Sequence, residues 1–148
     1  FVVCDEPVSA LDVSIQAQVI NLMQDIKKEY QLTYLFISHD LRIIKHFCDR
    51  VMVMYLGNIV ELGTKEAIYG NQRHPYTKAL LSAVSNVKGH GSKNRIILQG
   101  DIPSPVNPPS GCPFHTRCSY CMDICREKKP ELKKMADGTL VACHLDME

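Results

Sequence analysis

The sequence has no apolar stretch near the roughly 20 residues that a membrane-spanning helix needs. Its start lacks the charged and apolar segments of a secretory signal. It also lacks a marked excess of one charge, because 17 basic and 16 acidic side chains give a formal net charge of +1. These absences argue against an integral membrane protein and against nucleic acid as a partner. We expect a soluble chain that can still dock onto a membrane protein.

Cysteine, by contrast, is abundant, with seven residues in 148. Cys4 and Cys48 stand alone in apolar segments, where we interpret them as core residues. The other five follow position 111. An odd total without a secretory signal argues against a disulfide framework. Clustered thiols in a reducing compartment are more typical of a metal or an iron–sulfur cluster.

The first half of the chain alternates strand-like and helix-like segments. Apolar side chains recur at helical spacing after Asp12, a residue suited to an N-cap. The expected elements are a strand over 1–6, a helix from Asp12 to about Tyr30, a strand over 32–37 and a short helix over 41–47. This order predicts an α/β fold with a parallel sheet and helical cover.

The rest of the chain changes character twice. Two strands around Leu56-Gly57-Asn58 predict a hairpin, an appendage at the edge of the parallel sheet. The expected elements are strands over 51–55 and 59–62, helices over 65–69 and 76–84, a linker over 86–94, a short strand over 96–98 and an irregular proline-rich segment over 101–111. The cysteine-rich tail follows.

The first strand ends in two adjacent carboxylates, Asp5 and Glu6. In open α/β sheets, ligands bind at the carboxyl ends of the strands. Two carboxylates at such an end are suited to hold a hydrated magnesium ion and to activate a water molecule. Alone, however, an acidic pair after an apolar run is usually a solvated loop.

Two further motifs make the pattern specific. Phe1–Glu6, continued by Pro7-Val8-Ser9-Ala10-Leu11-Asp12, resembles the Walker B strand and D-loop of an ABC transporter ATPase. Downstream, Ile37-Ser38-His39-Asp40-Leu41 resembles the switch-histidine segment of the same family. Three motifs in the right order are far more specific than any one of them.

The resemblance implies a role for each of these polar residues. Asp5 would organise the magnesium ion of Mg-ATP, and Glu6 would be the general base or the water-orienting group for attack on the γ-phosphate. His39 would contact the γ-phosphate and help to hold Glu6. Ser9 and Asp12, in the D-loop, would lie at the interface between two ATPase domains.

Other motifs of that family are missing from the sequence. It contains no G-x-x-x-x-G-K-[ST] phosphate loop, no glutamine-bearing loop and no Ser-Gly-Gly signature. Without them, little remains to cradle phosphates. The sequence also starts inside a motif, without Met. We therefore expect the C-terminal half of a longer protein, inactive as an ATPase on its own.

Downstream motifs narrow the family. Five segments resemble the oligopeptide/dipeptide branch of ABC importer ATPases. They are His74-Pro75-Tyr76-Thr77, Leu80-Leu81, residues 100–105, residues 111–118 and Cys143-His144. A nickel-importing branch is similar, so the cargo stays open. The resemblance implies a second ATPase subunit and transmembrane permease subunits as partners, and a substrate-binding protein indirectly. It also implies a peripheral location at the cytoplasmic face of the plasma (inner) membrane.

The tail thiols have the spacing C-x5-C-x2-C-x3-C-x17-C. Four thiolates within reach of one another could bind zinc or a [4Fe–4S] cluster. The family resemblance marks Cys112, Cys118, Cys125 and Cys143 as the ligands, and some members of the family carry an iron–sulfur cluster there. The alternative is that these cysteines are small buried apolar groups.

Two departures leave the ligand set open. Cys121 is a fifth thiol where relatives commonly have a small residue, and Ser119 replaces a frequent proline. Cys121 is thus a possible substitute ligand. His115 and His144 are further alternatives, although a local hydrogen-bonding role fits them better.

We divide the chain into the C-terminal half of a P-loop ABC-type nucleotide-binding domain (1–63), a helical segment (64–87) and a small cysteine-rich extension (88–148). The leading hypothesis is the energy-coupling ATPase of a peptide importer. The rival is a metal-binding or interaction module without turnover.

Overall fold

The computed structural model describes residues 1–84 and 95–145. The chain forms two compact units, Phe1–Asp49 and Arg50–Glu148, and each is described by itself. The linker expected over 86–94 lies outside the described residues. Within the described ranges, every helix is too short or too polar to cross a membrane.

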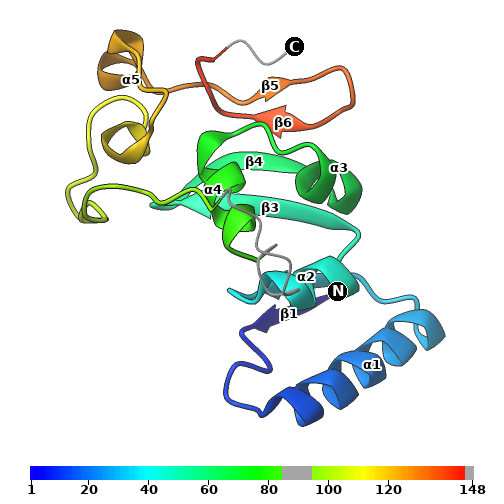
Figure 1. Ribbon diagram of the computed structural model, residues 1–148. Helices are drawn as coiled ribbons and strands as arrows, with labels where there is room; N and C mark the ends of the chain where they lie inside the picture. The colour runs from blue at the N-terminus through cyan, green and yellow to red at the C-terminus, as the bar shows by residue number, and fades with distance from the viewer. Residues whose placement is uncertain (85–94, 146–148) are drawn as a thin grey trace. The chain divides into compact units, whose positions relative to one another are not determined.

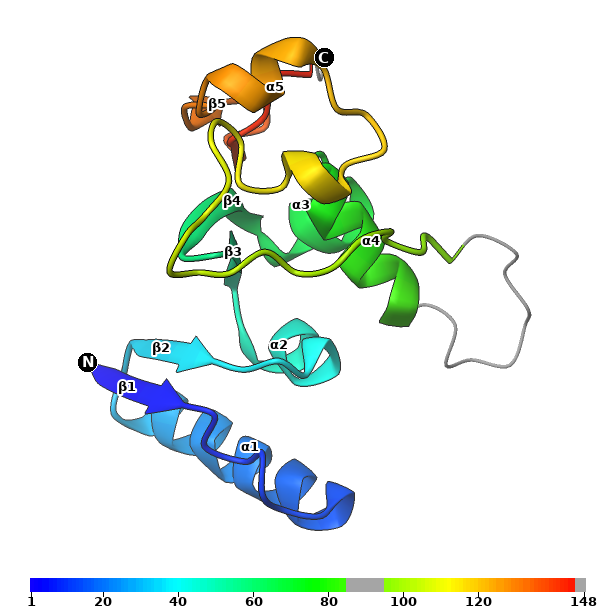
Figure 2. The same cartoon turned by 90° about the vertical axis from the view of Figure 1, so that its left-hand side faces the viewer.

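The first unit is a β-α-β-α segment whose two strands pair in parallel, as the sequence predicts. Val2 lies opposite Tyr34 and Asp5 opposite Ile37. Figure 2 shows α1 running beside the two strands. The elements are β1 (Val2–Asp5), α1 (Val13–Glu29), β2 (Tyr34–Ile37) and α2 (Leu41–Phe47).

One face of this strand pair is buried and the other is not. Val8, Ile20 and Phe47 form the core of the unit, and Tyr34 and Phe36 pack against it. On the opposite face, Val3 is 59% exposed. Three more large apolar side chains are also exposed, namely Phe1, Leu35 and Ile37. The alternation of strand side chains between faces explains this division.

The second unit contains a four-stranded antiparallel sheet of order β3-β4-β6-β5, visible in Figure 1. Its strands are β3 (Arg50–Tyr55), β4 (Asn58–Thr64), β5 (Lys133–Lys134) and β6 (Leu140–Val141). The predicted hairpin is confirmed, and Leu56 and Gly57 both have positive φ, as a two-residue type I′ turn requires.

The predicted place of this hairpin was wrong. It is not bonded to the edge of the parallel sheet, because β4 pairs with β6 from the far end of the chain. Leu62 lies opposite Leu140, and Val141 is fully buried. The short tail hairpin could not be predicted, because strands of two residues carry no periodic signal.

The remaining elements are short, and they are α3 (Lys65–Gly70), α4 (Pro75–Val84), the 3-10 turn η2 (His115–Arg117) and α5 (Asp123–Glu127). Both helices predicted over 65–69 and 76–84 are confirmed. The strand predicted over 96–98 was wrong, since these residues have no regular structure. Ile96 and Ile97 are 43% and 78% exposed, so this apolar run lacks the sheet neighbour that a strand needs.

A buried carboxylate fixes the entry into α4. Glu61 is fully buried on β4, and its two oxygens accept the backbone N–H groups of Arg73 (2.8 Å) and His74 (3.1 Å). The side chain of Arg73 in turn bonds Asp137 at 2.9 Å in the turn between β5 and β6. This network ties together three parts of the second unit that are far apart in the sequence.

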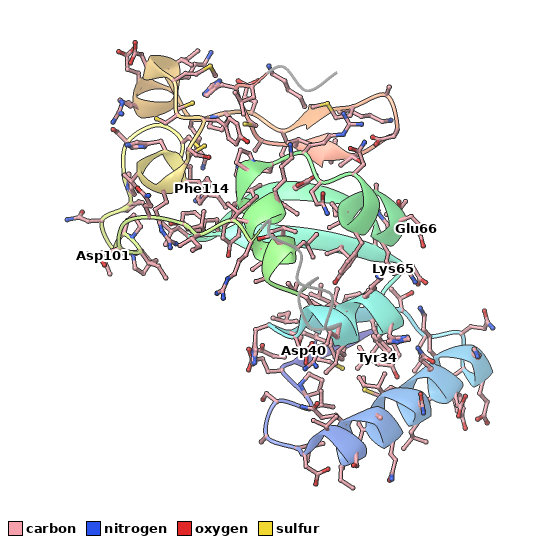
Figure 3. All side chains as sticks on the ribbon, viewed as in Figure 1. Tyr34, Asp40, Lys65, Glu66, Asp101 and Phe114 are labelled. Atoms are coloured by element: carbon pink, nitrogen blue, oxygen red, sulfur yellow. The ribbon has the colours of Figure 1, made fainter. Side chains whose placement is uncertain are left out.

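We predict that Glu61→Ala destabilises the chain by about 2–4 kcal/mol, because it leaves two backbone N–H groups buried without an acceptor. Urea unfolding followed by circular dichroism measures this loss. The matched control is Glu66→Ala at an exposed site on α3 (Figure 3), which should cost less than about 1 kcal/mol. Equal losses in the two variants would show that the buried contacts contribute nothing special.

Candidate functional site

The carboxyl ends of β1 and β2 bring two of the predicted site residues into contact. Glu6 follows β1 directly, and its backbone N–H donates to the carbonyl of Ile37 at 2.9 Å. This bond continues the parallel pairing past the end of β1. His39 Nδ1 then lies 2.8 Å from Glu6 Oε1. Because an ionised carboxylate only accepts hydrogen bonds, Nδ1 is the donor, and Nε2 is left for another partner.

Glu6 has an unusual backbone conformation. Its φ is 45°, in the left-handed region that costs a non-glycine residue about 1–3 kcal/mol. The loop after it supports this conformation, since the hydroxyl and the backbone N–H of Ser9 both donate to the carbonyl of Glu6, at 3.0 and 3.2 Å. Val8, which is 2% exposed, anchors the same loop in the core.

The acidic residues around this pair have separate local tasks. Asp12 caps α1 by accepting the backbone N–H of Ile15 at 3.0 Å, as its N-cap assignment predicts. Asp40 caps α2 and also bonds the guanidinium of Arg42. Asp5 is exposed at the end of β1.

The contact between Glu6 and His39 changes the acidity of the histidine. The hydrogen bond that His39 donates to Glu6 and the charge of the Glu6 carboxylate raise the pKa of His39 above its ordinary value of 6.5. The side chains of His39 and Glu6 are 75% and 44% exposed, so water reaches both. The structure thus holds an acidic group and a basic group in contact at an accessible strand end.

The cysteines of the tail gather in one neighbourhood of the second unit. Cys112 and Cys125 are each 7% exposed, and the N–H of Cys112 donates to the carbonyl of Cys125 at 2.8 Å. The Cys112 thiol interacts electrostatically with those of Cys125, Cys143 and Cys118. Burial, opposed in part by a backbone hydrogen bond, raises the pKa of Cys112 to about 11.

Thiol donors suit zinc or an iron–sulfur cluster. Their geometry is looser than a metal site, however. Among residues 1–84 and 95–145, no three Cys, His, Asp or Glu side chains are arranged so that they could hold a metal ion. The ligand set Cys112, Cys118, Cys125 and Cys143 is therefore brought close together and stays a prediction.

The two histidines near the thiols bond to backbone carbonyl groups. His115 Nδ1 donates to Cys112 at 2.9 Å, and His144 Nε2 donates to Lys128 at 2.8 Å. These contacts give each histidine the local hydrogen-bonding role that the sequence favours over metal binding.

A layer of aromatic rings joins the cysteine-rich loop to the sheet. Phe114 is 1% exposed, and its ring centroid lies 5.2 Å from that of Tyr55 and 5.4 Å from that of Tyr76. Figure 3 shows Phe114 between this loop and α4. His74 packs on the same ring, and burial lowers its pKa to about 4. The His-Pro-Tyr-Thr motif is thus part of the core.

Comparisons with known proteins agree with this architecture. The model of the oligopeptide/dipeptide transporter C-terminal region matches residues 60–125. The chain is 58% identical over 146 residues to the oligopeptide transport ATP-binding protein AppF of Bacillus subtilis, covering 97% of this chain and 44% of that protein. The family model and this identity support a fragment of the oligopeptide/dipeptide transporter family. It is also 55% identical over 146 residues to the dipeptide transport ATP-binding protein DppF of Haemophilus influenzae, covering 98% of this chain and 45% of that protein.

The chain thus spans less than half the length of these transporter-family relatives. A third, the putative oligopeptide transport ATP-binding protein YkfD of Bacillus subtilis, is 52% identical over 147 residues, with 98% of this chain and 45% of that protein covered. The family inferred from the sequence motifs is confirmed.

Sequence reasoning missed two polar contacts, one in the loop after Glu6 and one before α4. Gln16 donates from Nε2 to the Val8 carbonyl at 3.0 Å and so anchors the loop after Glu6. No local sequence signal predicts this contact. Glu61 did carry one, because a single carboxylate inside an apolar strand is expected to find buried donors.

We predict that Glu6→Gln lowers the pKa of His39 toward 6.5, because it removes the carboxylate charge. An NMR titration of the histidine ring protons measures the shift. Because the pKa of His39 is raised on folding, the contact favours the folded chain below about pH 6.5 and loses this effect as the pH rises through the folded-state pKa. His74 is the internal control and should not move, while an unchanged His39 pKa would contradict the assignment.

Proposed function

We propose that this chain supplies the magnesium- and water-binding corner of an ABC-type ATPase that powers peptide import. The contact between Glu6 and His39 at adjacent strand ends carries the proposal. The names of the similar proteins, oligopeptide and dipeptide transport ATP-binding proteins, support the peptide cargo over nickel. A metal-binding module without turnover explains neither the contact nor these relatives.

Each carboxylate has a distinct proposed task. Glu6 accepts a proton from the water that attacks the γ-phosphate, and His39 holds Glu6 through Nδ1 while Nε2 faces the phosphate. The raised pKa of His39 favours the protonated ring, in which Nε2 donates a hydrogen bond to an anionic oxygen. Asp5, exposed at the strand end, provides a hard oxygen ligand for the magnesium ion of Mg-ATP.

The D-loop residues are proposed to meet a second ATPase domain. Ser9 and Asp12 are both exposed, although each already makes a local hydrogen bond. We propose that the loop they hold in shape, rather than one free side chain, forms the contact between domains.

The exposed face of the β1–β2 pair supports a larger domain in the whole protein. Parallel sheets in α/β proteins are covered on both faces, yet Val3 and Leu35 are 59% and 42% exposed. We propose that a nucleotide-binding domain ends at residue 63, followed by a helical segment (64–87) and an extension (88–148). Permease subunits at the cytoplasmic face of the inner membrane and, indirectly, a substrate-binding protein would be the partners.

We propose a metal-binding role for the tail as well. Cys112, Cys118, Cys125 and Cys143 would hold a [4Fe–4S] cluster or, alternatively, zinc, and Cys121 is a possible substitute ligand. The nearness of the four thiols supports this, and their soft donor chemistry suits both groups. Such a group would cross-link the 112–125 loop to the segment that follows β6.

We predict that the 148-residue chain alone does not hydrolyse ATP, whereas a chimera in which it replaces the matching residues of AppF does. In that chimera, Glu6→Gln should retain ATP binding and lower turnover about 100-fold or more, because the general base is lost. Phosphate release and nucleotide-binding titrations measure the two effects. Glu66→Gln is the matched control and should hydrolyse normally, while normal turnover in Glu6→Gln would refute the role.

We predict that anaerobic purification yields a chain with bound iron and sulfide or with zinc. Cys125→Ser should lose this metal, because it removes one of four ligands, whereas Cys48→Ser, in the first unit, should keep it. Elemental and sulfide analysis decides between the two groups. A wild-type chain that contains neither metal would defeat the proposed role of the tail.

A further inference from the structure

The fifth thiol of the tail lies in a tight turn with one of the proposed ligands. The backbone N–H of Cys121 donates to the carbonyl of Cys118 at 3.3 Å, and Ser119 and Tyr120 form the turn between them. In a turn of this kind, the first and last Cα atoms lie within about 7 Å. Disulfides join Cα atoms about 4.4–6.8 Å apart. The backbone therefore already holds Cys118 and Cys121 close to bridging distance.

Exposure distinguishes this pair from Cys112 and Cys125. Cys118 and Cys121 are both partly exposed, whereas Cys112 and Cys125 are buried. Thiol–disulfide exchange requires that the reagent reach the sulfur, so a soluble disulfide meets the 118–121 pair more easily than the 112–125 pair. Cys118 Sγ also interacts electrostatically with Cys143, which is partly exposed and is thus the main competitor.

The side chains need only a local rearrangement. Cys121 Sγ points to the carbonyl of Met122, 3.6 Å away, and this weak contact costs little to break. Rotation about one side-chain bond redirects the sulfur, a motion that takes picoseconds to nanoseconds for accessible side chains.

We propose that Cys118 and Cys121 form a reversible disulfide by exchange with a low-molecular-weight disulfide. The Cys121 thiolate attacks one sulfur of the reagent, forms a mixed disulfide and releases one thiolate. The Cys118 thiolate then attacks Cys121 Sγ, forms the intramolecular bond and releases the second thiolate. The pair loses two electrons and two protons, and the reagent is reduced to two thiols.

This bond has a consequence for the proposed metal site, and here the inference rests on the proposed function of the tail. Cys118 cannot be a thiolate ligand while it is bonded to Cys121. The disulfide and the four-cysteine metal site therefore exclude each other. The pair would couple the redox state of the cell to metal occupancy in the tail.

The test uses the full 148-residue chain, reduced and then incubated with mixtures of glutathione and glutathione disulfide. Free thiols are blocked with N-ethylmaleimide before digestion. Trypsin cleaves after Arg117 and Arg126, so one peptide carries Cys118, Cys121 and Cys125. We expect this peptide to lose the mass of two hydrogens and to carry the blocking group on Cys125 alone. Cys121→Ser should abolish this product, and the control Cys48→Ser should keep it.

Other products would overturn the inference. A bond from Cys118 to Cys143 or from Cys112 to Cys125 would join two tryptic peptides, and a blocking group on Cys121 would exclude it from the bond. Complete blocking of all three cysteines, at a glutathione ratio that oxidises dithiothreitol, would overturn it too.

Zinc binding separates this inference from the metal proposal. Oxidation should lower the amount of zinc bound per wild-type chain several-fold. It should leave the amount of zinc bound per Cys121→Ser chain unchanged. A reduced wild-type chain that binds neither zinc nor iron refutes the metal proposal and its coupling, whereas the mass of the peptide still decides on the disulfide. Undiminished zinc binding by the oxidised wild type refutes the coupling alone.

Discussion

Parallel pairing of β1 with β2 is the constraint on which the candidate catalytic corner depends. Two parallel strands necessarily end at the same edge, so residues that follow them in the chain become neighbours. Glu6 and His39 are 33 positions apart, yet they lie 2.8 Å from each other. The helix α1 makes this pairing possible, because a parallel connection must return across the sheet. Its N-cap Asp12 and its core residue Ile20 thus act on the site through the strands.

The second unit is stabilised by buried polar and aromatic groups, whereas the first unit is organised by parallel strand pairing. Glu61 accepts two backbone N–H groups before α4, and Phe114 packs against both Tyr55 and Tyr76, whose rings also contact each other. These contacts set the position of the 112–125 loop. Gly111 is required at its start, because φ is +66° and a Cβ atom would lie 2.4 Å from the carbonyl of Cys125.

Local signals made much of this structure predictable, and the misses have one physical cause. Asp12 and the turn at Leu56 and Gly57 specify their structure through adjacent residues, and both were predicted. The strand expected over 96–98 also satisfied the local signal, but its side chains have no sheet neighbour. The pairing of β4 with β6 was missed for the opposite reason: it has no local signal, because Leu62 and Leu140 meet only after the chain folds. The site was inferred from family motifs, whereas the contact of Gln16 with Val8 and the contacts of Glu61 before α4 required the fold.

The exposure of the catalytic corner limits what it can do by itself. Glu6 and His39 make a good hydrogen bond, but water surrounds both side chains and screens their charges. In the proposed function, a bound nucleotide and a facing domain would exclude water and so strengthen this contact. Ser9 and Val8 hold the strained φ of Glu6 before any substrate binds. Because this conformation is already formed, the proposed reaction requires no reorganisation of Glu6. The corner therefore has a preformed geometry, while both of its side chains are exposed to water.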